Sequence, residues 1–311
     1  MKIYIVMDIE EITISHINAS TVHRLSEARQ NVLGTQAILE FDYEDNIKTP
    51  LFMETFLAET WYSAAELNAQ FLSLPEWQHQ ENEFSLSFDG VDEYMTVADA
   101  AAFVPGQNFS ISLWVKPAAL TSTKCILSQF RESGKYSWAI KLNGTATTVS
   151  VVYSSSGSDL DTTTTTGKVV YEAWNHIVIA FDGAAETPEM NVYINGALSL
   201  GDTTEFSSLY NTDVPIVIGG LGDQDSTATD LFEGNMDSVV LYDKTLDSTE
   251  VAELSSLRHP INIMSFTSSA NATAWWRMGD EYNGVSDPDE IAGNDAISVN
   301  MSISNKSTDV A

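Results

Sequence analysis

Apolar and polar residues alternate in short runs over most of the chain, and turn residues separate these runs about every ten positions. Residues 83–311 follow this pattern almost throughout, which is typical of an antiparallel sandwich or jelly roll. Helical spacing is nearly absent there, apart from one short stretch for which we expect Ser248 to be the N-cap. We therefore predict a mainly β domain over residues 83–311.

Residues 1–82 show a different pattern, in which strands and helices are mixed. Strands are predicted over 2–7 and 35–43 from alternating apolar residues, and helix-like spacing covers 21–33. A second helix is predicted over 63–74, between a capping-box arrangement and a proline. The pattern predicts a small N-terminal α/β module in front of the jelly roll.

This N-terminal module holds many aromatic residues for its size. A fold of about 80 residues buries only part of such a set by itself, and aromatic side chains are favoured at the centres of protein interfaces. The alternative is that these residues form the module's own core or pack on the jelly roll. We expect the module to anchor the chain to an assembly through Phe52, Phe56, Trp61, Tyr62, Phe71 and Trp77.

The chain is strongly acidic, with 44 Asp and Glu against 14 Lys and Arg and a net charge of −30. This charge repels phosphate backbones and anionic lipid surfaces, so we expect no nucleic-acid partner and no membrane partner. A single cysteine, Cys125, excludes an intrachain disulfide and a cysteine-based metal cluster. The apolar residues before Asp8 are too few for a signal peptide or a membrane span, so we expect synthesis in a cytosol.

Six segments, in order along the chain, resemble the laminin-G-like or concanavalin-like jelly roll. They begin at Phe88 (FDGVDEYMTV), Phe109 (FSISLWVKP), Trp174 (WNHIV), Val192 (VYING), Ile218 (IGG) and Phe232 (FEGNMDSVVLYD). The resemblance implies an antiparallel sandwich of two sheets over this part of the chain.

Two further segments are similar to proteins of tailed bacteriophages. The run WWRMGD at 275–280 resembles the end of jelly-roll proteins carried by phages, especially marine ones, and the N-terminal strand and helix resemble small segments of virion proteins. The resemblance implies a non-enzymatic structural protein of the virion, made in the host cytoplasm and released by lysis. The N-terminal module would dock to capsid or tail proteins, the jelly roll would be displayed as a decoration or adhesion domain, and we expect a homo-oligomer.

The alternative function is that of a surface adhesin or receptor-binding protein, which binds or degrades a host surface glycan. Sugar sites use aromatic side chains as stacking platforms. Each candidate alternates into a strand or stands at its end, so core packing is the competing interpretation. The candidates in or beside loops are Tyr136, Trp138, Tyr153 and Tyr210.

The adjacent residues Trp275 and Trp276 constrain the packing of the C-terminal strand. Neighbouring strand residues point to opposite faces of a sheet. Only one of the two can face the core, so the other must meet a second layer, a neighbouring subunit or solvent.

Candidate catalytic residues are scarce. The glucanases of this fold place two carboxylates on one strand face, as glycoside hydrolysis needs, and the sequence has no such strand. His176 is the only histidine in the matched segments, at a position that the resemblance makes structural, and nothing marks a nucleophile elbow. We therefore predict that the chain is not an enzyme.

Calcium is the cofactor that the resemblance implies, because jelly rolls of this type often hold one Ca²⁺ through hard oxygen ligands. The implied ligands are Asp89, in the opening turn, and Asp237, in the FEGNMD strand. A second candidate is the acidic loop over 222–230, which contains Asp223 and Asp225. That loop starts like an EF-hand but lacks its glycine and its final glutamate, so a solvated acidic loop is the alternative.

Overall fold

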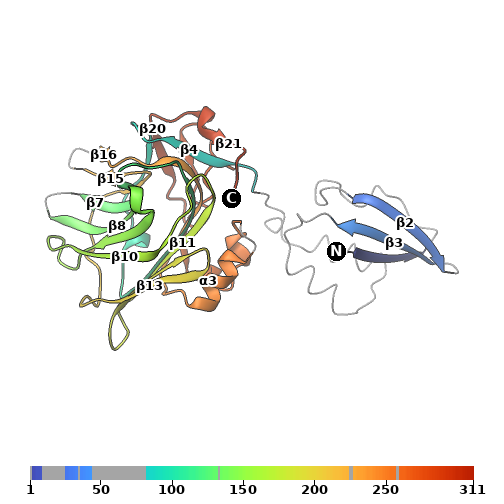
Figure 1. Cartoon of the computed structure of the whole chain (residues 1–311), viewed down its shortest axis with the longest axis horizontal. Coiled ribbons are helices and arrows are strands. Elements are labelled where there is room, and N and C mark those ends of the chain that lie inside the picture. The colour runs from blue at the N-terminus through green and yellow to red at the C-terminus, as the bar shows by residue number, and fades with distance from the viewer. Residues whose placement is uncertain are drawn as a thin grey trace. The chain divides into compact units, whose positions relative to one another are not determined.

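A computed structural model describes residues 2–8, 25–33, 36–43, 82–131, 134–223, 227–256 and 259–311, and the first three of these ranges by their backbone only. The chain divides into two compact units, Met1–Glu81 and Asn82–Ala311 (Figure 1).

The N-terminal unit contains a three-stranded antiparallel sheet in the order β1-β3-β2. Its strands are β1 (Lys2–Asp8), β2 (Leu25–Leu33) and β3 (Gln36–Tyr43). The strands predicted over 2–7 and 35–43 are confirmed. The predicted helix over 63–74 and all the aromatic residues expected to anchor the chain, Phe52, Phe56, Trp61, Tyr62, Phe71 and Trp77, lie outside the described residues.

The helix indicated by the spacing over 21–33 is wrong for residues 25–33, which form a strand. Leu33 pairs with Gln36, so only Gly34 and Thr35 separate the two strands. Antiparallel pairing with β3, regular from Ala28 to Leu33, thus outweighs the helix-like spacing in this segment.

The C-terminal unit is a sandwich of two large antiparallel sheets, which confirms the jelly-roll fold class. The sheet that we call the front sheet has the order β10-β9-β8-β7-β14-β5-β20-β19, with strands at Asp161–Lys168, Thr148–Tyr153, Lys135–Asn143, Lys124–Arg131, Ile216–Ile218, Tyr94–Val97, Ala296–Val299 and Ser286–Asp287. The back sheet has the order β13-β12-β11-β6-β17-β4-β21, with strands at Ala197–Thr203, Glu189–Ile194, Asn175–Asp182, Asn108–Pro117, Glu233–Tyr242, Ser85–Asp89 and Lys306–Ser307. Strand β18 (Ala272–Trp276) pairs with β17, so the Trp-Trp segment belongs to the back sheet.

Short elements complete this unit. Strands β15 (Leu221–Gly222) and β16 (Ala228–Thr229) pair with each other, and β15 contacts β7 of the front sheet. No helix in the described residues is long and apolar enough to cross a membrane. The helical elements are α3 (Ser248–Ser255) and the 3₁₀ turns η4 (Ala101–Phe103), η5 (Gly144–Ala146), η6 (Ile263–Ser265), η7 (Ser269–Asn271) and η8 (Ile303–Asn305).

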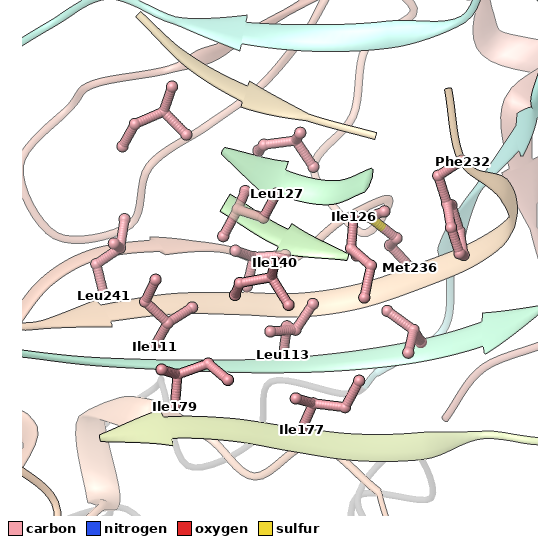
Figure 2. Packing of buried hydrophobic residues seen from close by; sticks show 14 of the residues in the cluster. Ile111, Leu113, Ile126, Leu127, Ile140, Ile177, Ile179, Phe232, Met236 and Leu241 are labelled. Atoms are coloured by element: carbon pink, nitrogen blue, oxygen red, sulfur yellow. The ribbon is translucent and has the colours of Figure 1, made fainter. Parts of the chain in front are cut away.

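The main core lies between the two sheets. Every second side chain of the central strands points into this space, because side chains alternate along a strand. Each fully buried aliphatic side chain contributes about 1.5–3 kcal/mol. Figure 2 shows residues of β6, β11 and β17 of the back sheet beside those of β7 and β8 of the front sheet, among them Ile111, Leu113, Ile177, Ile179, Leu241, Ile126, Leu127 and Ile140.

A second apolar layer covers the outer face of the back sheet, on the side where α3 lies in Figure 1. Trp275 belongs to this layer and is 3% exposed, whereas Trp276 lies between the two sheets and is 0% exposed. The prediction that only one of them faces the core is confirmed, and its neighbour meets a second layer. Further buried residues of this layer are Val178, Val240, Tyr242, Leu246, Val251, Leu254 and Phe266.

Helix α3 has Asp247 as its N-cap, where Ser248 was expected. The Asp247 side chain accepts hydrogen bonds from the backbone N–H groups of Thr249 (2.8 Å) and Glu250 (2.9 Å). In return, Glu250 Oε2 accepts from the Asp247 N–H (2.9 Å). This reciprocal capping box starts the helix at Ser248, because it satisfies backbone donors that have no partner inside the helix.

Gly234 lies where β17 and β6 approach closely, with a φ of +138°. A Cβ at this position would lie 2.3 Å from the carbonyl oxygen of Lys116. Gly234→Ala should therefore force the two strands apart and lower the free energy of unfolding by about 3 kcal/mol. Urea unfolding measures this loss. Gly106→Ala is the control, because its Cβ would meet nothing closer than 3.9 Å; equal losses in the two variants would contradict the close approach.

Candidate functional site

The outer face of the front sheet carries polar side chains over β8, β9 and β10. Core residues alternate with these side chains along β8 and β9, and the buried Thr163 and Thr165 flank Thr164 on β10, so the polar set points away from the other sheet. Antiparallel pairing places its members side by side in two rows. These rows are Thr164, Ser150 and Lys141, followed by Lys168, Thr148 and Asn143.

Four of these side chains are linked by hydrogen bonds. Asn143 Nδ2 donates to Thr148 Oγ1 (2.9 Å) and to Ser150 Oγ (2.7 Å). Ser150 Oγ and Thr164 Oγ1 share a further hydrogen bond at 2.7 Å. Ser150 is 6% exposed, so the network satisfies a buried hydroxyl, while Asn143 and Thr148 are half-buried and Thr164 is exposed. The network therefore offers amide and hydroxyl groups to a ligand from outside.

A cation and an aromatic ring extend this face along β8. Lys141 Nζ lies 3.3 Å from Asp230 Oδ2, and the Lys141 side chain is 20% exposed. Tyr136 stacks on Phe130 with ring centroids 4.6 Å apart and an interplanar angle of 24°, and it remains half-buried. The outer face thus combines hydrogen-bonding groups, one paired cation and one aromatic ring.

Two of the four aromatic residues predicted to bind sugar are core residues. Trp138 is 2% exposed and Tyr153 is 1% exposed. The two residues pair with each other across β8 and β9, and both project between the sheets. Because no ligand reaches that space, Trp138 and Tyr153 pack the core and are not candidate binding residues.

The other two predicted aromatic residues, Tyr136 and Tyr210, meet at Gly157. The Tyr136 N–H donates to the Gly157 carbonyl oxygen (3.2 Å). The Tyr210 ring lies so close that a Cβ on Gly157 would be 2.7 Å from it. Both tyrosines remain half-buried, so they are the predicted aromatic residues that keep surface for a ligand.

The calcium ligands implied by the resemblance do not come together. Asp89 ends β4 and is exposed, and it pairs across the sheet with Glu233. Asp237 follows Glu233 by four residues in β17, so the backbones of Asp89 and Asp237 are about 13 Å apart along the strands. The described residues contain no group of three His, Cys, Asp or Glu side chains suited to a metal ion. Asp89 and Asp237 therefore do not share an ion, and calcium binding at either of them stays a prediction.

The acidic loop over 222–230 is described in part. Asp223 follows β15, and its N–H donates to the Thr227 carbonyl oxygen (2.9 Å). Asp225 lies outside the described residues. Calcium binding by this loop likewise stays a prediction.

Asp237 belongs to a buried polar cluster beside the back sheet. Its Oδ2 accepts hydrogen bonds from Asn82 Nδ2 (2.9 Å) and from the Ala311 N–H (3.2 Å). Burial raises the pKa of Asp237 to about 8. Asp287 accepts from two backbone N–H groups (2.8 and 3.1 Å), and burial raises its pKa to about 7. The neutral form of Asp237 thus connects Asn82 and Ala311 to β17 at neutral pH.

His176 is buried on β11 and has the structural surroundings expected of it. Its Nε2 lies 2.8 Å from Ser112 Oγ, and its ring stacks on Trp114 with centroids 4.7 Å apart. Burial lowers the pKa of His176 to about 3, so the ring is neutral. Within the described residues, Nδ1 has no hydrogen-bond partner, so this pair lacks the third group that orients the histidine of a catalytic triad.

The two stacked antiparallel sheets define a lectin-like sandwich. The family profile described as the Concanavalin A-like lectin/glucanases superfamily, of laminin G type, matches residues 89–252. The chain belongs to this superfamily.

The fold also resembles solved structures. A protein from Bacteroides ovatus, provisionally described as carbohydrate-binding, aligns with a TM-score of 0.55 and 13% identity over 71% of this chain and 59% of that protein. This chain therefore spans less than two thirds of that protein's length, and the likeness shows the fold alone.

Two further likenesses have TM-scores below 0.5, and no conclusion is drawn from them. The CBM40 of Ruminococcus gnavus IT-sialidase, bound to α2,3-sialyllactose, has 15% identity over 55% of this chain and 98% of its own (TM-score 0.43). Domain 4 of a Geobacillus stearothermophilus arabinanase, in complex with arabinotriose, has 22% identity over 55% and 76% (TM-score 0.42). No curated protein sequence matches the chain.

The network residues Asn143, Ser150 and Thr164 are absent from the set predicted to bind a ligand. Polar residues do alternate with core residues at these positions, which is the available signal. Every solvent-facing strand shows the same alternation, however. The link among the three depends on the register of three strands, and alternation alone does not fix that register.

The raised pKa of Asp237 predicts a stability that falls with rising pH. This carboxyl group titrates near 3.8 in an unfolded chain and near 8 in the folded one. Between these values the folded state keeps the proton while the unfolded chain loses it, so stability is lost as the pH rises through this window. We expect the Tm to fall by about 5 °C or more between about pH 5 and about pH 9.

Scanning calorimetry of the intact chain measures this fall. It should be smaller in Asp237→Asn, whose side chain does not ionise, although Asp287 titrates in the same direction and keeps part of it. Asp89→Asn is the control, because Asp89 is exposed and asparagine supports the same turn. If Asp237→Asn lost as much stability with pH as the unchanged chain, Asp237 would not be the titrating group.

Proposed function

We propose that the outer face of the front sheet binds a carbohydrate, and that residues 82–311 act as a non-catalytic glycan-binding domain. The observation that carries the proposal is the linked set of amide and hydroxyl groups on β8, β9 and β10. Sugar hydroxyls both donate and accept hydrogen bonds, and these side chains do the same. Tyr136 and Tyr210 add aromatic surface at the far end of β8, where a sugar ring can stack.

The network keeps hydrogen-bonding capacity for a ligand. The Thr148 hydroxyl accepts from Asn143 and retains its own proton to donate. Thr164 shares one hydrogen bond with Ser150 and is exposed to solvent. A ligand therefore meets donors and acceptors whose positions are already fixed by their neighbours.

Binding without cleavage fits the charges on this face. Glycoside hydrolysis needs two carboxyl groups about 5 to 10 Å apart, on either side of the scissile bond. The two rows of outward residues on β8, β9 and β10 contain no Asp or Glu. Asp230 reaches this face from the loop after β16, and Lys141 neutralises it at 3.3 Å.

The comparisons support this proposal. The superfamily's description names lectins and glucanases, and the Bacteroides ovatus protein of similar fold is provisionally described as carbohydrate-binding. Both favour the glycan-binding alternative over a purely structural role. A place in a phage virion, anchoring through residues 1–82 and assembly as a homo-oligomer stay predictions.

The proposal predicts that damage to the network weakens glycan binding. Screening the intact chain on a glycan array should find ligands, and calorimetric titration should then show about tenfold weaker binding for Asn143→Ala combined with Thr164→Ala. Thr203→Ala is the control, because Thr203 is an exposed threonine on β13 of the other sheet.

Unchanged affinity in the double variant would place the binding site elsewhere. An array on which no glycan binds would overturn the proposed function itself. Far-ultraviolet circular dichroism of each variant shows whether the sandwich is intact, so that unfolding is not mistaken for a lost contact.

A further inference from the structure

The positive charges of this acidic protein are concentrated in one part of the sandwich. The whole chain has a net charge of −30, whereas residues 124–168 contain five Lys or Arg against three Asp or Glu, a net charge of +2. These residues span β7 to β10, which include the face that carries the hydrogen-bonded network. Asp230 and Asp213 lie outside this stretch of sequence but pair with Lys141 and Lys135, so this part of the sandwich is close to neutral in an otherwise strongly anionic protein.

Two lysines flank the network on this face. Lys141 pairs with Ser150 from the β8 side, and Lys168 pairs with Thr148 from the β10 side. The two lysines lie two strands apart and two residues apart along the strands. The diagonal distance between their backbones is therefore about 12 Å. This distance spans more than one sugar ring, so the two cations suit an oligosaccharide with repeated negative groups.

The two lysines differ in how they are held. Lys168 is exposed, in the row that also contains Thr148 and Asn143. Lys141 is 20% exposed and pairs with Asp230, whose side chain is 43% exposed. Charges elsewhere on the acidic surface are screened beyond about 8 Å at physiological ionic strength. The local cations therefore decide which ligand charge this face accepts.

We propose that the ligand of this face is an anionic glycan, with carboxylate or sulfate groups that contact Lys168 and Lys141 while its hydroxyls contact the network. This inference rests on the proposed function, and it adds the chemical class of the ligand. The Asp230 carboxylate competes with the ligand, because it forms an ion pair with Lys141 that an anionic group of the ligand must replace.

Two matched pairs of polymers test the ligand class by calorimetric titration of the intact chain. Oligogalacturonate is compared with its methyl ester, and dextran sulfate with dextran, so that only the charge changes within a pair. We expect at least one charged polymer to bind about tenfold more tightly than its neutral partner, and the preference to shrink between about 50 mM and about 500 mM NaCl. Which pair shows the preference identifies the carboxylate or the sulfate as the group recognised.

Two substitutions test the site in opposite directions. Lys168→Gln should weaken binding of the charged polymer about fivefold, whereas Lys306→Gln, on β21 of the back sheet, should leave it unchanged. Asp230→Asn should strengthen it about threefold, because it frees Lys141. Asparagine tolerates the left-handed backbone of residue 230, where φ is +49°. A gain in affinity is a result that structural damage does not produce.

The outcomes separate this inference from the proposed function. Equal binding of charged and neutral polymers, or no binding of either while the array finds neutral ligands, would overturn the anionic class and leave glycan binding in place. Weaker binding in Asp230→Asn would also overturn the inference, because Asp230 would then be a ligand-binding group. Failure of every glycan, on the array and in titration, would overturn both.

Discussion

The pairing of β17 with three other strands is the constraint on which the rest of the sandwich depends. One side of β17 pairs with β6, and the other pairs first with β4 and then with β18. Segments from the two ends of this unit are thereby joined through one central strand. A register shift between Asp237 and Val240, with φ of +44° at Ser238, accompanies the change of partner. Such a bulge resets which side chains face the core, so Met236, Val239 and Leu241 all point inward.

The same bulge places apolar side chains on the outer face of the back sheet. Beyond it, Val240 and Tyr242 point away from the main core. Leaving such apolar surface in water would cost about 25 cal/mol for each Å², and the chain that follows β17 returns as α3, the turns and β18 to cover it. The outer face of the front sheet is mixed: Ala139 and Val152 pack with Leu221 of β15 in a small apolar cluster, whereas the neighbouring outward positions of β8, β9 and β10 carry the polar network. The polar part of the front sheet is therefore the face that we propose for ligand binding.

Alternation predicted the sandwich and the opposite directions of Trp275 and Trp276, because both follow from local geometry. It did not show which of two neighbouring residues turns inward. Alternation alone therefore allows Trp138 and Tyr153 as binding residues, although the structure places them opposite each other in the core. The link between Asn143, Ser150 and Thr164 is invisible for the same reason, since strand register comes from packing across the whole sheet. Likewise, residues 25–33 form a strand because they pair with β3, although the spacing of their apolar residues resembles that of a helix.

The register that builds the core also fixes the polar side chains on the face that we propose for binding. Holding a polar side chain in one rotamer costs about 0.5–1.5 kcal/mol when it happens on binding. Asn143, Ser150 and Thr164 already hold one another in the folded chain, so most of that cost is met during folding. Strands β8 and β9 are held in place by Ile140, Leu142, Val149 and Val151, which alternate with Asn143 and Ser150 and lie in the core. The spacing of the groups that we propose to bind a ligand is thus set by the packing beneath them, and a change in that packing would move the donors and acceptors together with the strands.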